Sequence, residues 1–320
     1  MKVRVTALGE AMLRLSPPGL GRLRTGGSFD VHVAGAEANV AVALASLGVG
    51  TRYVTSLPDN PLGERVCRDL RAAGVDLEYV ETVDRGRLGI FFVEFGAGAR
   101  PSEVWYDRAD STFSQMDGYR PDCLDGVRLA LTSGITLAVS PTARHLAERF
   151  VADAAARGVG VCLDVNYRER LSSPEEARES IESVLPQAEI VVCSRLDARR
   201  VFGIEADDTS EVAAEFGGRF APKAKLVVVT DGENGCVGIC DDQVLTQEAI
   251  PAEPVVDRIG AGDAFLAGLV TGFVEGRPVA DSLRLAAAMG ALKCSVAGDQ
   301  ALFDRDEVGA VVEGKAGFTR

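Results

Sequence analysis

The sequence predicts an α/β protein, a three-layer α/β/α sandwich with a mainly parallel central sheet and a small lid of β-strands beside it. Two observations predict the sandwich. Short apolar runs of strand length alternate with stretches of helical length, and strands that are apolar throughout are typical of parallel sheets covered on both faces. A third observation predicts the lid, because two segments with alternating apolar and polar residues interrupt this pattern.

The elements of the sandwich follow one another from the N-terminus. Strands are expected at residues 3–8, 51–56, 127–132, 160–164, 190–194 and 226–230. Helices are expected at residues 37–47, 62–73, 142–157, 174–185, 210–220, 261–274 and 279–296. Right-handed crossovers place the carboxyl ends of the parallel strands along one edge of the sheet, so ligands are expected at that edge.

The lid is expected from residues 11–34 and 88–110, whose alternating stretches predict antiparallel strands outside the main sheet. No internal repeat or linker-like stretch divides the chain, which predicts a single domain over residues 1–320 with a loosely ordered tail at 314–320. Exposed lid strands would carry unpaired edges. Two lids packed together would cover them, so we expect a homo-oligomer, either a dimer through the lids or a larger assembly.

Composition restricts the class of protein. The 320 residues are 47% hydrophobic and 25% charged, with a net charge of -13, so a core is expected, while nucleic acids and anionic membranes are not expected partners. No apolar run is long enough to span a membrane and the N-terminus lacks a signal-like stretch, which predicts a cytoplasmic protein. The 7 cysteines are expected to be reduced core residues, and 2 histidines are too few for a multi-histidine metal site.

The segment Gly260-Ala261-Gly262-Asp263 is the first candidate for chemistry. It follows an expected strand and loop at 253–259 and opens a helix rich in Ala and Leu. Small side chains leave the first amides of a helix bare, which suits a phosphate or the charge on a transferring phosphoryl group. Asp263 would then be placed to take a proton from a hydroxyl group, although a helix N-terminus lowers the pKa of an Asp. The alternative is an ordinary N-terminal cap.

A second turn of small residues, at 34–39, precedes another helix. A substrate could approach the backbone at Gly35, and Asn39 can donate to hydroxyl groups or accept from them. The alternative is a tight connection from the lid to the helix, with Asn39 on the helix surface.

Further polar residues follow expected strands. Arg168 ends the segment 164–168 at the ligand edge, and Arg108 lies at the end of the lid. Each could pair with a carboxylate or a phosphate, or form a surface salt bridge. The segment 230–235 could cradle the phosphates of a nucleotide or be a simple β-turn.

These motifs in this order resemble the pfkB, or ribokinase-like, family of carbohydrate kinases. The resemblance runs from residues 9–10 to 298–299, and its most specific element is the D-x-x-G-A-G-D-x-F pattern at 257–265. Within the family, the 2-keto-3-deoxygluconate kinases are the most similar. The shared segments are 34–41, 106–108, 133–136, 164–168 and 173–177.

The resemblance implies an ATP-dependent kinase that phosphorylates the terminal hydroxyl of 2-keto-3-deoxy-D-gluconate. Asp263 would be the catalytic base, with an anion hole from Gly260, Ala261 and Gly262. The residues implied to contact the sugar acid are Gly35, Glu37, Asn39, Phe91, Tyr106, Arg108, Ile135 and Arg168. Those implied around ATP are Asn166, Arg168, Ser194, Thr230, Gly232, Gly235, Gly260 and Gly262.

The implied cofactors are ATP and Mg²⁺, with K⁺ as a further candidate. The N-x-x-E motif that the family associates with magnesium and phosphate falls at Ser194–Asp197, where Ser replaces Asn and Asp replaces Glu. Asp197 is therefore the candidate metal contact, through a water molecule.

Two other functions stay open on the sequence. One is a kinase for fructose or another neutral sugar, although the two arginines suit a substrate with a carboxylate. The other is a non-catalytic sugar- or nucleotide-binding protein, since a fold by itself does not prove activity. A nicotinamide-dependent dehydrogenase is disfavoured because the chain has no G-x-G-x-x-G fingerprint.

Overall fold

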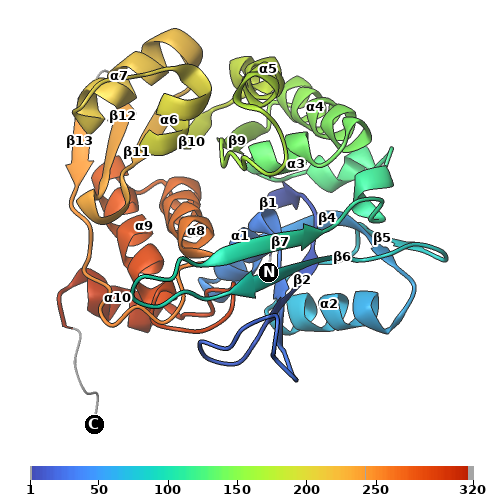
Figure 1. The fold of residues 1–320 in the computed structure, drawn as a ribbon. Coiled ribbons are helices and arrows are strands. Elements are labelled where there is room, and N and C mark those ends of the chain that lie inside the picture. The colour runs from blue at the N-terminus through green and yellow to red at the C-terminus, as the bar shows by residue number, and fades with distance from the viewer. Residues whose placement is uncertain (1, 242, 316–320) are drawn as a thin grey trace.

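Nine strands form the central sheet of the computed structural model, which describes residues 2–241 and 243–315 (Figure 1). The strand order is β13-β12-β11-β10-β9-β8-β1-β4-β5. β1 (Val3–Leu8) lies inside the sheet and pairs in parallel with β4 (Gly50–Pro58) on one side and with β8 (Leu129–Ser133) on the other. The remaining strands are β5 (Val80–Val83), β9 (Gly160–Asp164), β10 (Ile190–Ser194), β11 (Leu226–Thr230), β12 (Cys236–Cys240) and β13 (Gln243–Gln247).

All six strands expected for the sandwich are present. Four of them, β1, β9, β10 and β11, have the expected bounds. β5, β12 and β13 were not expected. β5 and β13 have few buried residues, so they lack the continuous apolar run that marks the inner strands. β12 and β13 form an antiparallel hairpin on β11, which makes the sheet mainly parallel rather than wholly so.

Two layers of helices cover the sheet, as expected. One hydrophobic core joins the sheet to α1 (Ala36–Ser46), α2 (Pro61–Ala72), α8 (Ala261–Glu275), α9 (Val279–Lys293) and α10 (Arg305–Val312). The other joins it to α3 (Gly134–Ala138), α4 (Pro141–Ala156), α5 (Pro174–Val184), α6 (Arg195–Phe202) and α7 (Thr209–Phe220). Figure 1 shows the two groups on either side of the sheet, in blue or orange and in green to yellow.

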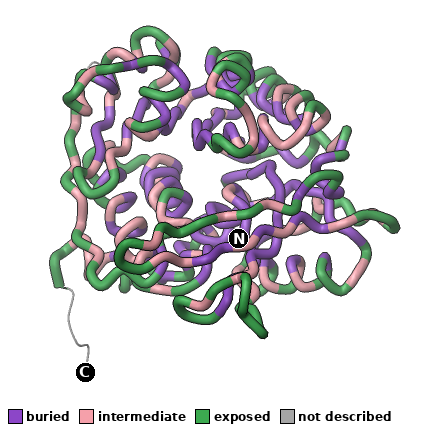
Figure 2. Tube along the Cα trace, viewed as in Figure 1, coloured by how far each residue is buried: buried purple, intermediate pink, exposed green. Residues whose placement is uncertain are grey.

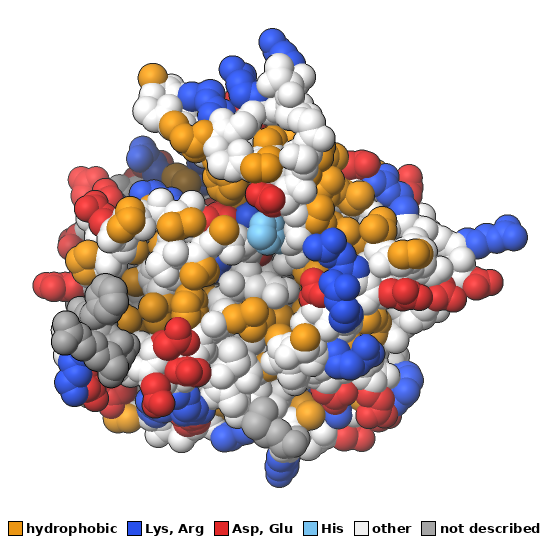
Figure 3. Space-filling model, turned by 90° about the horizontal axis from the view of Figure 1, so that it is seen from below, with side chains coloured by type: hydrophobic (Ala, Val, Ile, Leu, Met, Phe, Trp, Pro, Cys, Tyr) orange, Lys and Arg blue, Asp and Glu red, His pale blue; other side chains and the backbone are white. Residues whose placement is uncertain are grey.

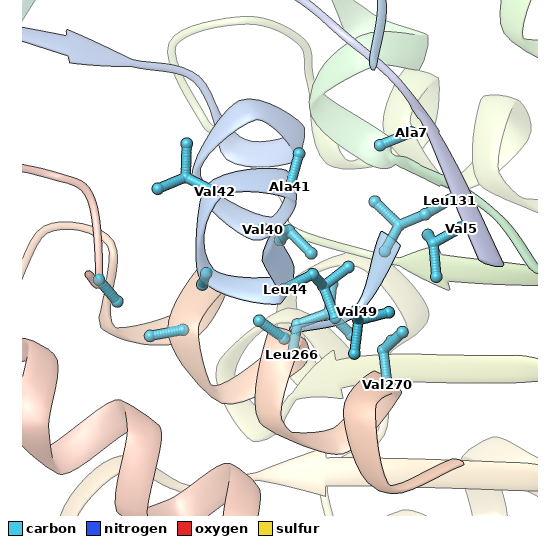
Figure 4. Close-up of a cluster of buried hydrophobic side chains, with 14 of the residues drawn as sticks. Val5, Ala7, Val40, Ala41, Val42, Leu44, Val49, Leu131, Leu266 and Val270 are labelled. Carbon is cyan, nitrogen blue, oxygen red and sulfur yellow. The ribbon is translucent and has the colours of Figure 1, made fainter. Parts of the chain in front are cut away.

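The packing of α1 against α8 brings together two segments that are far apart in the sequence. Leu44 of α1 lies beside Leu266 and Val270 of α8, and all three face Val5 of β1 and Leu131 of β8 (Figure 4). These five side chains are at most 1% exposed. The first turns of both helices are thereby fixed relative to the same strands.

The lid is a four-stranded sheet in the order β3-β2-β6-β7. Its strands are β2 (Met12–Ser16), β3 (Asp30–Ala34), β6 (Gly89–Glu94) and β7 (Glu103–Asp107). The expectation of antiparallel strands is wrong for the central pair, because β2 and β6 are parallel. The long connection through α1, β4, α2 and β5 permits a parallel pair, whereas a short hairpin would not. Figure 2 shows exposed and intermediate residues along β7, the outer strand.

Three further expectations concern residues 253–259, the C-terminal tail and the cysteines. Residues 253–259 are a loop without the expected strand. The tail expected at 314–320 lies outside the described residues from 316 onward. The seven cysteines are all free, and four of them are buried.

The surface carries charges of both signs. Acidic, basic and hydrophobic side chains are interspersed over the face drawn in Figure 3. No helix among the described residues has the length and apolar character needed to cross a membrane.

Candidate active site

The start of α8 has amides of two kinds. Among the described residues, those of Gly260 and Gly262 have no hydrogen-bond partner. That of Ala261 donates to the carbonyl oxygen of Arg258 at 3.1 Å. The cap of α8, Gly260, has a φ of 88°, a conformation that favours glycine, and a Cβ at Gly260 would lie 2.0 Å from the carbonyl oxygen of Asp299. Gly262 differs, since a Cβ there would meet no atom of the described residues within 4 Å. The first amides of a helix have no partner inside the helix. An anion at the start of α8, which the sequence predicts, stays a prediction that this geometry permits.

Asp263 lies in the first turn of α8 and meets the first turn of α1. The amide nitrogen Nδ2 of Asn39 donates to Oδ2 of Asp263 at 2.7 Å. Asn39 is 4% exposed and Asp263 is 9% exposed, so Asn39 does not lie on the helix surface, which was the alternative. The hydrogen bond orients the carboxylate and leaves Oδ1 available for a hydroxyl group.

Burial raises the pKa of Asp263 to about 6, against the lowering effect of the Asn39 hydrogen bond and the Arg168 charge. The expectation of a lowered pKa, drawn from the helix N-terminus alone, is therefore wrong. Loss of solvation outweighs the helix dipole when a carboxylate is enclosed. A carboxylate with a pKa near neutrality accepts a proton more readily than an exposed one does.

Two further carboxylates share the electrostatic field of Asp263. Burial and the charges of Asp263 and Asp197 raise the pKa of Asp164, at the end of β9, well above its usual value. Burial also raises the pKa of Asp197, in the first turn of α6. The ionisation of Asp164 is therefore disfavoured by its two acidic neighbours as well as by burial.

Arg168 supplies positive charge to all three carboxylates, since its charge lowers the pKa of each. Its side chain is exposed and donates to the adjacent carbonyl of Tyr167 at 3.2 Å. Within the described residues Arg168 forms no ion pair, so its guanidinium can bind an anionic ligand. Asn166, two residues earlier, has a φ of 39°, a strained conformation that is concentrated at functional sites.

The first turn of α1 is built differently from the sequence-based interpretation. Gly35 has a φ of 138° and its Cβ would lie 2.2 Å from the carbonyl oxygen of Glu10, so the backbone itself requires glycine there. Glu37 is 1% exposed and accepts hydrogen bonds from Ser133 Oγ at 2.6 Å and Thr136 Oγ1 at 2.7 Å. These bonds attach α1 to α3, where Ile135 is half-buried.

On the lid, Arg108 already has a counter-charge. Its Nε donates to Oε2 of Glu10 at 2.8 Å, and its Nη2 contacts the same oxygen. Glu10 is 3% exposed and Arg108 is 7% exposed. Phe91 and Tyr106 stack beside this pair with ring centroids 5.7 Å apart, and the guanidinium lies 5.7 Å from the Tyr106 ring.

The other residues expected around the nucleotide lie at the carboxyl ends of β10 and β11. Ser194, the last residue of β10, caps α6 by accepting from the amide of Asp197 at 3.0 Å. Thr230 ends β11, and the chain then turns back into β12 through a short 3₁₀ segment at Gly232–Asn234. Gly235 has a φ of 91°, and its Cβ would lie 2.1 Å from the carbonyl oxygen of Gln247. The turn interpretation of 230–235 is confirmed, and a nucleotide contact there stays a prediction.

Sequence reasoning missed two residues at the site. Glu10 pairs with Arg108, and Asp164 joins the carboxylates at the ligand edge. The position of Asp164 at the end of an apolar strand is a signal that could have identified it. No local signal marks Glu10 as the partner of a residue 98 positions away.

The fit of Mg²⁺ depends on these carboxylates. Asp164, at the end of β9, and Asp197, in the first turn of α6, supply the hard oxygen atoms that Mg²⁺ prefers. Among residues 2–241 and 243–315, no group of three or more His, Cys, Asp or Glu side chains could hold a metal ion by itself. This fits a cation bound mainly through phosphates and water, as Mg²⁺ usually is.

Comparisons with known proteins agree with this geometry. The model of the pfkB family of carbohydrate kinases matches residues 2–305. A 2-dehydro-3-deoxygalactonokinase from Haloferax volcanii is 38% identical over 323 residues, covering 100% of this chain and 100% of that protein. The crystal structure of a 2-dehydro-3-deoxygluconokinase from Thermotoga maritima has a TM-score of 0.91 and 33% identity, covering 98% of this chain and 99% of that one.

A more distant structure shares the fold. It is a candidate ribokinase II from Escherichia coli, solved in complex with ATP and Mg²⁺, with a TM-score of 0.88 and 20% identity over 98% of this chain and 100% of that one.

Proposed function

The chain belongs to the pfkB family of carbohydrate kinases, and from this premise we propose that it transfers the γ-phosphate of ATP to the terminal hydroxyl of 2-keto-3-deoxy-D-gluconate. The product would be 2-keto-3-deoxy-6-phosphogluconate. The coarser description is a phosphotransferase with an alcohol acceptor, a sugar-acid kinase that uses ATP. The observation that carries the proposal is Asp263 beside the amides of Gly260 and Gly262. The guanidinium of Arg168, which has no ion pair within residues 2–241 and 243–315, lowers the pKa of the same carboxyl group.

The chemistry assigned to these residues is a proton transfer coupled to phosphoryl transfer. Asn39 holds Oδ2 of Asp263, and Oδ1 accepts the proton of the sugar hydroxyl as its oxygen bonds to the γ-phosphorus and the bond to ADP breaks. The amides of Gly260 and Gly262 stabilise the charge on the phosphoryl oxygens. The amide of Ala261, which the sequence also predicts for this role, donates to the carbonyl oxygen of Arg258. Mg²⁺, held near Asp164 and Asp197, would neutralise phosphate charge when bound.

Recognition of the acid is assigned mainly to Arg168. Arg168 has no ion pair within the described part of the chain, whereas the charge of Arg108 is matched by Glu10. A free guanidinium forms the stronger, charge-assisted contact with an incoming carboxylate. Gly35, Phe91, Tyr106 and Ile135 are proposed to surround the rest of the sugar.

The galactonate-derived epimer is the second candidate substrate, because the relative at 38% identity is named a 2-dehydro-3-deoxygalactonokinase. The test is a coupled ADP assay with ATP and Mg²⁺ on both keto-acids and on fructose and ribose. We expect turnover on the keto-acids. Turnover on fructose with none on either keto-acid would contradict the proposal, and ADP formation with none of the four would favour a non-catalytic binding protein.

Two variants assign the roles within this assay. Asp263→Asn is expected to bind ATP normally and to lose most turnover. Arg168→Met is expected to raise KM for the keto-acid far more than KM for a neutral sugar. Arg219→Met, at an exposed arginine of α7 that pairs with Glu215, is the control. An equal rise for both sugars would show that Arg168 does not read the carboxylate.

A further inference from the structure

A buried cluster of charged side chains lies behind the start of α8, and the proposed chemistry does not use it. Its members, each at most 3% exposed, are Arg14, Asp257, Lys293 and Asp299. Arg14, on the lid strand β2, contacts Oδ2 of Asp257 at 2.8 Å and Oδ2 of Asp299 at 3.1 Å. Charged groups are rarely buried unless they are paired, and these two ion pairs supply partners for Arg14, Asp257 and Asp299.

Lys293 differs from the other three because, among the described residues, its side chain bonds to main chain alone. Its Nζ donates to the carbonyl oxygen of Asp257 and to that of Val296, both at 3.2 Å. Its side chain is 0% exposed, and no carboxylate lies within ion-pair distance in residues 2–241 and 243–315. The ammonium is therefore a cation enclosed between two backbone segments.

Both segments lead directly to the open amides of α8. Asp257 lies three positions before Gly260, and its Oδ1 accepts from the amide of Ile259 at 2.9 Å. On the other side, the amide of Gly298 donates to Oδ2 of Asp257 at 3.1 Å. Gly260 itself packs against the carbonyl oxygen of Asp299. Any shift of residues 294–299 relative to residues 256–260 would thus move the amides at the start of α8.

We infer that Lys293 is a positioning residue for phosphoryl transfer, whose ammonium binds segments 256–260 and 294–299 together and so fixes the amides of residues 260–262. The inference rests on the proposed function only in taking those amides as the phosphate site. Lys293 lies behind the site and touches neither sugar nor nucleotide in this arrangement. Loss of the ammonium group should lower kcat and leave the KM of both substrates nearly unchanged. Amides displaced from their catalytic positions stabilise the transition state less.

Lys293→Met tests the inference, because methionine keeps the length and the apolar stem and removes the ammonium. We expect kcat to fall by about 10- to 100-fold, the cost of a small misplacement of catalytic groups, with each KM within threefold of wild type. Lys225→Met is the matched control. Lys225 is exposed and binds Glu189, beside the opposite ends of the strands.

Two readouts separate positioning from a general loss of folding. Lys293→Ala should regain turnover in methylammonium chloride and not in tetramethylammonium chloride at equal ionic strength, because only the smaller cation donates hydrogen bonds to carbonyl groups. Hydrogen exchange of peptides covering 257–265 should be faster in Lys293→Met than in Lys225→Met, whichever sugar is the substrate. The exchange result stands even if the keto-acid assay fails, so the two proposals fail separately.

Three results would overturn the inference. The first is a kcat of Lys293→Met within twofold of wild type with unchanged exchange at 257–265. The second is a loss of kcat that matches the unfolded fraction measured by near-ultraviolet circular dichroism. The third is an equal effect of the two ammonium salts on Lys293→Ala.

Discussion

At the scale of single residues, Asp263 is a carboxylate whose environment opposes its charge. Burial raises its pKa to about 6, and the hydrogen bond from Asn39 moves the pKa in the opposite direction. This balance suits the proposed role of Asp263 as a base, since a carboxylate with a pKa near 6 is mostly ionised at neutral pH and still accepts a proton.

The pH dependence of turnover follows from this pKa. We expect kcat/KM to fall about tenfold per pH unit below pH 6, because the protonated carboxyl cannot act as a base, and to level off above pH 7. Asn39→Ala removes a bond that lowers the pKa of Asp263, so its acidic limb should lie at higher pH. The measurement is an initial-rate profile at saturating Mg²⁺. A limb that stays in place in Asn39→Ala would show that another group, such as ATP, controls it.

The residues that carry local motifs could be predicted from the sequence, and their partners could not. Asp263, Gly260 and Arg168 stand in recognisable patterns at the start of a helix or the end of a strand. The Asn39–Asp263 hydrogen bond spans 224 positions and the Arg108–Glu10 pair spans 98. Such pairs depend on how distant segments pack, which no local spacing encodes.

At the scale of elements, the start of α8 has two glycines with different reasons to be glycine. Gly260 is required by its backbone and by its contact with Asp299, while Gly262 is an ordinary helical position that faces open space. The same residue type therefore serves folding at one position and access for a ligand at the other.

Alanine at each position should separate these reasons. Gly260→Ala should lower the free energy of unfolding by at least about 2 kcal/mol, because it strains φ and clashes with a carbonyl group. Gly262→Ala should be as stable as wild type or slightly more, and should lose turnover because its methyl group occupies the space proposed for the phosphate. Urea unfolding and steady-state kinetics measure both effects. Normal kinetics in Gly262→Ala would exclude these amides as the anion site.

Elements with strong apolar periodicity were predictable, and weakly buried ones were not. β9, β10 and β11 are continuous apolar runs that match the expected bounds. β5 and β13 lie at the two edges of the sheet and bury little. These two segments are strands because they pair with a neighbouring strand. Their own residues show no pattern that predicts this pairing.

At the scale of the whole molecule, two buried carboxyl groups lower stability at neutral pH. Burial raises the pKa of Asp263 to about 6 and that of Asp299 to about 7. A carboxyl with a raised pKa holds its proton in the folded state while the unfolded chain ionises. Its contribution to stability is complete below pH 4 and is lost as the pH rises through 6 to 7.

Asp263→Asn should therefore stabilise the ligand-free protein in one pH range. At pH 8 we expect an increase of about 2 to 3 kcal/mol in the free energy of unfolding, from a shift of roughly two pKa units. At about pH 3, roughly one unit below the pKa of an unfolded Asp, the difference should nearly vanish, because the carboxyl is then mostly neutral in both states. Urea titrations at the two pH values provide the measurement. An equal gain at both would mean that charge is not the cause.

Self-association through the lid is a prediction at the same scale. Leu20, Phe29 and Trp105, which belong to the lid, are 57%, 38% and 38% exposed, and burying them in a second lid would be favourable. We expect a dimer in sedimentation velocity, with Trp105→Glu shifting it to monomer. Val244→Glu, on the outer strand of the main sheet, is the control. A wild-type monomer, or dissociation by Val244→Glu alone, would contradict a lid interface.

The contact of α1 with α8 also has a consequence for the order in which the protein is made. On the ribosome α1 emerges long before α8, and at ordinary translation rates the interval is about 10 to 40 seconds. During that time the apolar face of α1 that Figure 4 shows against Leu266 and Val270 has no cover from its own chain. Chaperones can bind this exposed apolar face of the nascent chain. Asn39 has no carboxylate partner at Asp263 until α8 has been synthesised.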